Sequence, residues 1–232
     1  MGQWFKGRIY ERRSDLSPDG KYLIYFAAKY VSKGEALYSW TAISFAPFIK
    51  ALALYAKGDT YYGGGLWTTN RSYWLNPGPG YNSALFDTGL VSEDMSYQPP
   101  RIGNAECLGV YYPRLLRDGW KLLHSLRSDK AKTDIFEKDL SHAWRLRKFA
   151  LAGSIKVPGR GVYRDEHELV HSKTGTVIKF PKWEWAERDG QDVVWAEGGK
   201  LMRAVVGEGG LQSTRLIRDF NDMTFEPIEA PY

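Results

Sequence analysis

Short apolar runs separated by tight polar turns recur along the chain. The clearest run covers residues 22–28, and the turn Ser17-Pro18-Asp19-Gly20 leads into it. Gly20 supplies the positive φ that such a turn needs, and Asp19 can hydrogen-bond back to its own backbone. Runs of this length bounded by Gly, Pro, Asn and Asp are typical of β-strands. The pattern therefore predicts a chain of short sheets.

The same pattern predicts most of the remaining elements. Strands or hairpin arms are expected at residues 3–12, 36–44, 72–75, 107–112, 120–126, 134–138, 167–171, 176–180, 185–195, 200–206 and 211–220. Residues 144–151 alternate basic and apolar side chains, which favours an edge strand. Residues 48–55 fit a strand or a helical turn equally well. Gly63, Gly64 and Gly65 predict a bulge or a place where another group approaches the backbone closely.

A long turn-rich connection is expected at residues 76–101. Its anchors in the apolar pattern are Leu85-Phe86 and Leu90-Val91. Long connections without regular structure are uncommon in compact domains, and they often carry function. This connection is the best single candidate for a segment that forms a site.

Composition supports an all-β chain outside the secretory pathway. Aromatic residues make up 15% of the 232 residues, and 24 Gly and 11 Pro indicate many turns. The single cysteine, Cys107, excludes an internal disulfide and favours a reducing compartment. The N-terminus lacks the apolar core of a signal peptide, and the longest apolar run, residues 42–56, contains Pro47 and Lys50. A cytoplasmic location without a membrane span is expected.

The turns recur at nearly constant spacing. Turn positions fall at Gly20, Arg71, Gly119, Glu166 and Gly190, with intervals of 51, 48, 47 and 24 residues. Propeller blades repeat about every 40–50 residues, with four strands in each. The last interval is about half a blade. The spacing favours a β-propeller, and the rival fold is a β-sandwich with a few helical turns.

At residues 17–25 the chain resembles the propeller repeats of the TolB and WD40-like family. The run Ser17-Pro18-Asp19-Gly20-Lys21-Tyr22-Leu23-Ile24-Tyr25 carries the resemblance. Residues 185–202 match in layout without Ser-Pro, and residues 117–120 are a weaker copy. The resemblance implies one propeller-like domain of about five blades over residues 1–232. It implies a recognition scaffold, although some five-bladed members are glycoside-processing enzymes.

Charge is distributed unevenly along the chain. Residues 111–160 carry 12 basic and five acidic residues, whereas residues 161–232 carry nine basic and 13 acidic ones. The basic stretch could attract nucleic acid or another anionic partner. The favoured interpretation is a solvated rim that the acidic last third partly neutralises. A nucleic-acid role therefore ranks third among the functions considered.

Two groups of residues fit catalytic patterns, and the sequence favours neither. His167-Glu168-Leu169-Val170-His171 satisfies the zinc-peptidase pattern, but that chemistry requires a helix, and the flanking residues predict a hairpin with its tip at Lys173-Thr174-Gly175. No metal or cofactor is predicted. The alternative function is a glycoside-type hydrolase with carboxylates in a central channel, and its candidates are Asp15, Glu106, Glu187 and Asp189.

The sequence thus favours a non-enzymatic recognition scaffold whose partner is another protein. Aromatic rings and arginines are common at such contacts, although most rings in an all-β chain fill the core. The candidate binding residues, on and around the long connection, are Trp67, Tyr73, Trp74, Tyr81 and Arg101.

Overall fold

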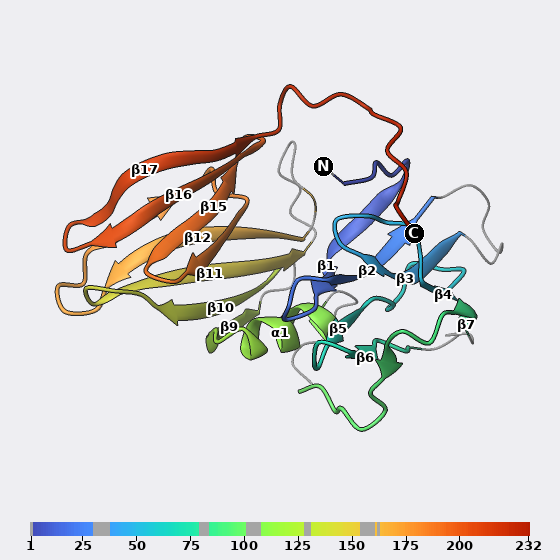
Figure 1. Cartoon of the computed structure of the whole chain (residues 1–232). Coiled ribbons are helices and arrows are strands. Elements are labelled where there is room, and N and C mark those ends of the chain that lie inside the picture. Colours follow the sequence, from blue (N-terminus) through green and yellow to red (C-terminus); the bar gives the residue numbers. More distant parts are fainter. Residues whose placement is uncertain are drawn as a thin grey trace. The chain divides into compact units, whose positions relative to one another are not determined.

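The computed structural model shows a mainly β-structure with largely antiparallel strands (Figure 1). The described residues are 2–29, 38–78, 84–100, 108–127, 131–153, 161 and 163–232. Strands account for 54% of the described residues, which also contain one helix. The strands form four open sheets, so a number of propeller blades is not confirmed. Among the described residues, no helix is long and apolar enough to cross a bilayer.

Two compact units divide the chain. Unit 1 comprises Met1–Leu115 and Phe225–Tyr232, and unit 2 comprises Leu116–Thr224. The division leaves the expectation of one propeller-like domain over residues 1–232 as a prediction. Each unit contains two sheets.

Unit 1 contains a five-stranded sheet of order β1-β2-β3-β4-β7 and a three-stranded sheet of order β5-β6-β8. Their strands are β1 Arg8–Leu16, β2 Tyr22–Ala28, β3 Ser39–Phe45, β4 Ala53–Ala56, β5 Gly65–Trp67, β6 Ser72–Leu75, β7 Ala84–Asp87 and β8 Ser92–Glu93. All pairs are antiparallel except β6 with β8. The core of this unit is aromatic, and Tyr22, Trp67 and Tyr73 lie at its centre.

Unit 2 contains a five-stranded sheet of order β13-β12-β11-β10-β9 and a four-stranded sheet of order β14-β15-β16-β17. Within each sheet consecutive strands pair, as Figure 1 shows for β9 to β12 and β15 to β17. Its strands are β9 Lys121–Arg127, β10 Ala131–Asp139, β11 Trp144–Gly153, β12 Tyr163–His171, β13 Val177–Phe180, β14 Trp185–Asp189, β15 Asp192–Glu197, β16 Lys200–Gly207 and β17 Gly210–Asp219. The stacked rings of Trp183 and Trp195 lie in its core.

The turn before β2 has the predicted chemistry. Gly20 has φ +71°, and its N–H donates to the carbonyl of Ser17 at 2.8 Å. The carboxylate of Asp19 accepts hydrogen bonds from the Ser17 hydroxyl and the Lys21 N–H at 2.7 and 3.2 Å. The Ser17 hydrogen bond is the main reason why the pKa of Asp19 is lowered. This network fixes the first residue of β2 in register.

Gly20→Ala is expected to lower the free energy of unfolding by about 1–2 kcal/mol. A Cβ at this position meets no atom within 4 Å, so the cost is that of a left-handed backbone with a side chain. Thermal unfolding would measure it. Gly209→Ala is the control, since its Cβ also meets nothing and its φ is not left-handed. An equal melting temperature for both variants would contradict the role of the turn.

The three consecutive glycines confirm the predicted close approach. Gly63 and Gly64 have φ of +74° and +76°. A Cβ would lie 2.5 Å from the Phe26 ring at Gly63 and 2.1 Å from the Arg13 carbonyl oxygen at Gly64. The backbone of this segment therefore packs directly on β1 and β2 with no room for a side chain.

Three sequence predictions of secondary structure are wrong. Residues 108–112 belong to the helix α1 Leu108–Arg117, not to a strand, and Cys107 lies outside the described residues. Tyr111 and Leu115, four residues apart, are both buried, which is the helical period that a short apolar run cannot reveal. β11 is a central strand, not an edge strand, because acidic residues on its neighbours pair with its basic ones. The connection at residues 76–101 contains β7 and β8.

Candidate functional site

Two of the predicted binding residues form the core of unit 1. Trp67 and Tyr73 are buried, with ring centroids 5.7 Å apart, and Trp67 also packs on Tyr22 at 5.4 Å. The backbone N–H of Trp67 donates to the buried carboxylate of Asp15 at 2.8 Å. In this structure these rings support the sheets, which is the role that the sequence favours for most of its aromatic residues.

Trp74 is the predicted residue that the structure brings to the long connection. It is half-buried and points away from Tyr73, because successive side chains of β6 alternate between faces. Its ring centroid lies 6.0 Å from that of Tyr97. Tyr81 and Arg101 lie outside the described residues.

Backbone hydrogen bonds fix the segment of residues 84–97 on unit 1. The N–H of Thr88 donates to the Leu52 carbonyl at 3.1 Å, and the N–H of Asp94 donates to the Tyr73 carbonyl at 2.7 Å. Arg71 accepts from the Ser92 N–H at 2.9 Å through its carbonyl and donates to the Leu90 carbonyl at 3.3 Å through its guanidinium. The segment therefore has a defined conformation.

Hydrogen bonds of two tyrosine hydroxyls connect β7 to the core of unit 1. The hydroxyl oxygens of Tyr55 and Tyr73 lie 2.5 Å apart, and Tyr55 donates to the carboxylate of Asp87 at 3.2 Å. Burial is the main cause of the raised pKa of both tyrosines, so both remain neutral. The network joins β4, β6 and β7.

The segment exposes large apolar side chains. Leu85, Phe86, Leu90 and Met95 are 52%, 46%, 44% and 78% exposed. We call these four residues the apolar patch. The sequence assigned Leu85, Phe86 and Leu90 to anchor the connection, but of the expected anchors Val91 alone is buried. An ordered backbone that presents apolar side chains to solvent is suited to contact with another macromolecule.

The described carboxylates considered for hydrolysis each have a local partner. Glu187 accepts from the Trp120 indole N–H at 2.9 Å and pairs with Lys138 at 2.5 Å. Asp189 pairs with Arg203 at 2.9 Å. Asp15 belongs to unit 1 and is buried, and Glu106 lies outside the described residues. These contacts are those of structural carboxylates.

The residues of the zinc-peptidase pattern lie on a strand. β12 pairs with β13 in the expected hairpin, and Glu168 lies on the opposite face from His167 and His171. Four residues along a strand span about 13 Å, so the two imidazoles do not converge. Glu168 pairs with Arg147 at 2.9 Å. Within the described ranges, no group of three or more His, Cys, Asp or Glu could hold a metal ion.

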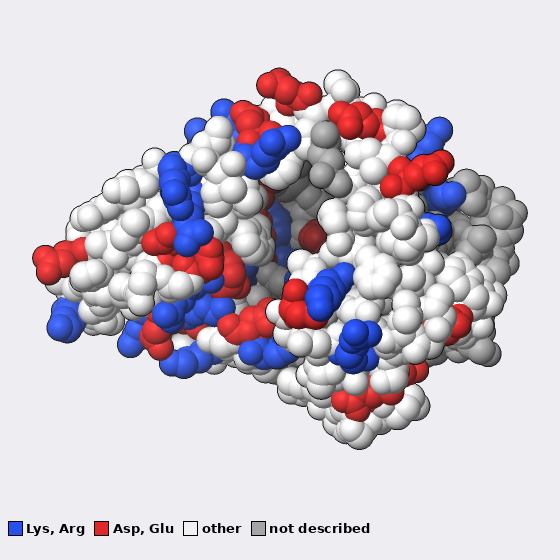
Figure 2. Space-filling model, viewed as in Figure 1, with Lys and Arg blue, Asp and Glu red and all other residues white. Residues whose placement is uncertain are grey.

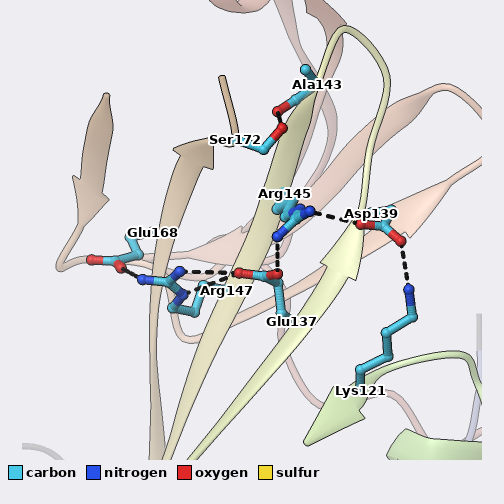
Figure 3. A network of polar contacts seen from close by, with 8 residues as sticks. All are labelled: Lys121, Glu137, Asp139, Ala143, Arg145, Arg147, Glu168 and Ser172. Carbon is cyan, nitrogen blue, oxygen red and sulfur yellow. Dashed lines mark hydrogen bonds and ion pairs between the residues drawn. The ribbon is translucent and has the colours of Figure 1, made fainter. Parts of the chain in front are cut away.

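One face of the β9–β13 sheet carries a ladder of alternating charges (Figure 3). The ladder links neighbouring strands at distances of 2.7 to 3.4 Å, and its members in order are Lys121, Asp139, Arg145, Glu137, Arg147 and Glu168. A hydrogen bond from Lys121 is the main cause of the lowered pKa of Asp139. The three cations and three anions cancel, so the ladder presents no net charge to a partner.

On the opposite face of that sheet, further basic residues form ion pairs with acidic residues. Lys148 is buried and lies 3.3 Å from the Asp165 carboxylate. Lys138 and Lys148 both lie over the Trp120 ring, 5.2 and 4.9 Å from its centroid. Asp165 and Glu187 come from the acidic last third of the sequence. Blue and red side chains accordingly lie next to one another on the face of unit 2 seen in Figure 2.

Comparisons with known proteins identify no relative of this chain. No family model, curated protein or solved structure matches the chain. The case for a function therefore rests on the residues of the two units.

Proposed function

We propose that this chain is a non-enzymatic recognition scaffold that binds another protein through the apolar patch of unit 1. The observation that carries the proposal is the exposure of Leu85, Phe86, Leu90 and Met95 on a segment whose backbone is held by hydrogen bonds. A preordered segment loses little conformational entropy on binding, so its apolar contacts contribute more to affinity.

Charge on the same segment favours a protein over a nucleic acid. Residues 84–97 include Asp87, Glu93 and Asp94 and contain no lysine or arginine. Burial is the cause of the raised pKa of Glu93. These carboxylates repel phosphates, whereas an apolar segment flanked by basic residues complements them. We therefore expect the partner to present apolar side chains beside lysine or arginine.

β7 offers a route for that contact. It is the last strand of its sheet, and all four of its residues are exposed. An extended segment of the partner can add to such an edge through backbone hydrogen bonds while side chains supply specificity. The proposal needs the sheets of unit 1 only as a rigid support. The five-bladed propeller implied by the TolB and WD40-like resemblance remains a separate prediction.

Replacing the patch tests this function. Leu85→Ser/Phe86→Ser is expected to reduce capture of the partner from a lysate of the source cells by at least about tenfold, because two central apolar contacts are lost. Exposed substitutions of this kind leave folding nearly unchanged. The measurement is quantitative mass spectrometry of proteins retained by immobilised chain.

The matched control is Val177→Ser in unit 2, where the replaced side chain is 47% exposed. It is expected to retain the partner at the wild-type level. If the patch variant and the wild type capture the same proteins in equal amounts, the patch is not the binding surface and the proposal is wrong.

A further inference from the structure

β17 is a long strand at the edge of its sheet. It is the last strand of the β14–β17 sheet, and within the described ranges no further strand pairs with its other side. Residues 212–218 are all exposed, and the side chains of Leu216 and Ile217 are 50% and 46% exposed. The free side of β17 therefore presents backbone N–H and C=O groups to which an extended segment can add as a fifth strand.

Contacts at both ends hold β17 in place. At the tip of the β16–β17 hairpin, the indole N–H of Trp144 donates to the Glu208 carbonyl at 3.0 Å. At the other end of the strand, the N–H of Phe220 donates to the Gly199 carbonyl at 2.9 Å. A strand fixed in this way loses little conformational entropy when a segment binds to it.

A bulge places two arginines of β17 on the same face. Arg215 pairs with Arg203 on β16. Arg218 pairs with Leu201, so the extra residue of β17 lies at Ile217 and three residues of β17 span two of β16. Residues two apart on a strand share a face, and so do their direct partners. Arg215 and Arg218 therefore point to one side, separated along the strand by about 6.6 Å, the rise of two residues.

These two arginines have no acidic partner among the described residues. Both are exposed, and neither forms an ion pair there. The acidic residues around them are already engaged, because Asp189 and Asp192 pair with Arg203 at 2.9 and 2.5 Å. Asp219 pairs with Lys200 at 3.3 Å. β17 thus presents two uncompensated positive charges beside exposed apolar side chains.

We propose that β17 binds an extended acidic segment of another protein, which adds to the sheet as a fifth strand. Carboxylates two residues apart in that segment share a face and match the separation of Arg215 and Arg218. Leu216 pairs with Met202 between these two positions and so lies on the opposite face. It meets the residue between the two carboxylates, which we expect to be apolar.

The charge and the free backbone of β17 favour this occupant over two others. Antiparallel pairing of two β17 strands, centred on their exposed residues, would set the arginines of one copy against those of the other. A nucleic acid gains its affinity from contacts between phosphates and many cations, and it cannot extend a sheet. This inference does not depend on the apolar patch of unit 1, which carries acidic residues and is proposed to bind a basic partner.

Fluorescence anisotropy of short labelled peptides added to the full chain tests the site. One probe alternates glutamate with valine, and the other has glutamine in place of each glutamate. The wild type is expected to bind the glutamate probe at least about tenfold more tightly. Arg215→Gln/Arg218→Gln is expected to abolish this preference, and circular dichroism checks that the variant is folded. Equal binding of the two probes by the wild type overturns the proposal.

Two further probes test strand addition. Each is the glutamate peptide methylated on alternate backbone nitrogens, one at the odd and the other at the even positions, so that each lacks the N–H donors of one edge. We expect one of them to bind at least about tenfold more weakly than the parent peptide and the other to bind as the parent does. Parent-like binding of both would overturn strand addition.

The control variant removes two positive charges elsewhere in unit 2. Lys173→Gln/Lys182→Gln replaces two exposed lysines and is expected to keep the wild-type affinity for the glutamate probe. Arg215→Glu/Arg218→Glu is expected to prefer a probe with lysine in place of glutamate, and a persistent preference for glutamate would contradict the proposal. An oligothymidine probe that binds more tightly than the glutamate peptide, and only while both arginines are present, would assign the site to nucleic acid instead.

Discussion

Gly64→Ala is expected to lower the free energy of unfolding of unit 1 by about 2 to 5 kcal/mol. The left-handed backbone at φ +76° costs about 1–2 kcal/mol once a side chain is present. Overpacking adds about 1–3 kcal/mol, because the new Cβ would lie 2.1 Å from the Arg13 carbonyl oxygen. A loss of this size is a large part of the stability of a small domain. Urea unfolding followed by tryptophan fluorescence measures it.

Arg13 has no room to move away from such a methyl group. Its side chain is buried, and its guanidinium donates to the carbonyls of Thr60, at 2.7 Å, and Tyr62. The guanidinium also lies 4.9 Å from the centroid of the Phe26 ring.

Gly89→Ala separates the two costs. Gly89 has φ +70°, close to that of Gly64, but its Cβ would meet no atom within 4 Å. We expect this variant to lose only the backbone cost of about 1–2 kcal/mol. Equal losses at Gly64 and Gly89 would show that β1 does not pack against the glycine segment as described.

Asp165→Asn is expected to destabilise unit 2 by about 3 kcal/mol. The substitution removes the carboxylate that lies 3.3 Å from the Lys148 ammonium and leaves a buried cation without that charge. Removing one partner of a buried ion pair is costly because the remaining charge keeps its desolvation penalty. The midpoint of urea unfolding measures the loss.

Asp139→Asn is the matched control in the same sheet. Asp139 pairs with Lys121 at the shorter distance of 2.7 Å, but both side chains are more than half exposed. Solvent screening limits such a pair to less than about 1 kcal/mol. If both variants lose the same stability, burial does not govern the strength of these pairs.

Local pattern was sufficient to predict the strands that lie between strong turns. The predicted strands at residues 22–28 and 72–75 match β2 and β6 in both bounds. The predicted turns at Gly119 and Gly190 have the positive φ that was expected of them. Backbone preference at these positions is set by the glycine itself, so tertiary contacts are not needed to predict them.

The helix α1 and the central position of β11 depend on tertiary contacts. Val110, Tyr111 and Tyr112 form a short apolar run whose period is ambiguous, and packing decides it. Arg145 and Arg147 gave β11 the appearance of an edge strand. Their partners Glu137 and Glu168 are on neighbouring strands, and the sequence does not show which strands are neighbours.

The segment of the candidate site was predicted, but its residues were largely not. The long connection at residues 76–101 was identified because it lacks a strong periodic pattern. Trp67 and Tyr73 lie in the core, whereas Leu85, Phe86, Leu90 and Met95 are exposed. Hydrophobicity alone would place the leucines, Phe86 and Met95 in the core and leave the more polar tyrosine and tryptophan at the surface. The available signal was the lack of alternating apolar positions around residues 84–95.

The basic stretch shows why net charge along a sequence is a weak guide to a binding surface. Residues 111–160 have a large basic excess, yet Lys138, Arg147 and Lys148 pair with acids from residues 161–232. The sequence predicted that the acidic last third would partly neutralise the basic stretch, but it did not identify the individual pairs. The pairs of Arg147 and Lys148 follow from the register of β11 with β12, whereas Glu187 reaches Lys138 from β14 of the other sheet.

Protein recognition by the apolar patch is tested most directly by the dissociation constant of the captured partner, measured by titration calorimetry. Compared with the wild type, Leu85→Ser/Phe86→Ser should raise this constant at least about tenfold, while Val177→Ser should leave it unchanged. Identical dissociation constants for the wild type and the patch variant would contradict the account.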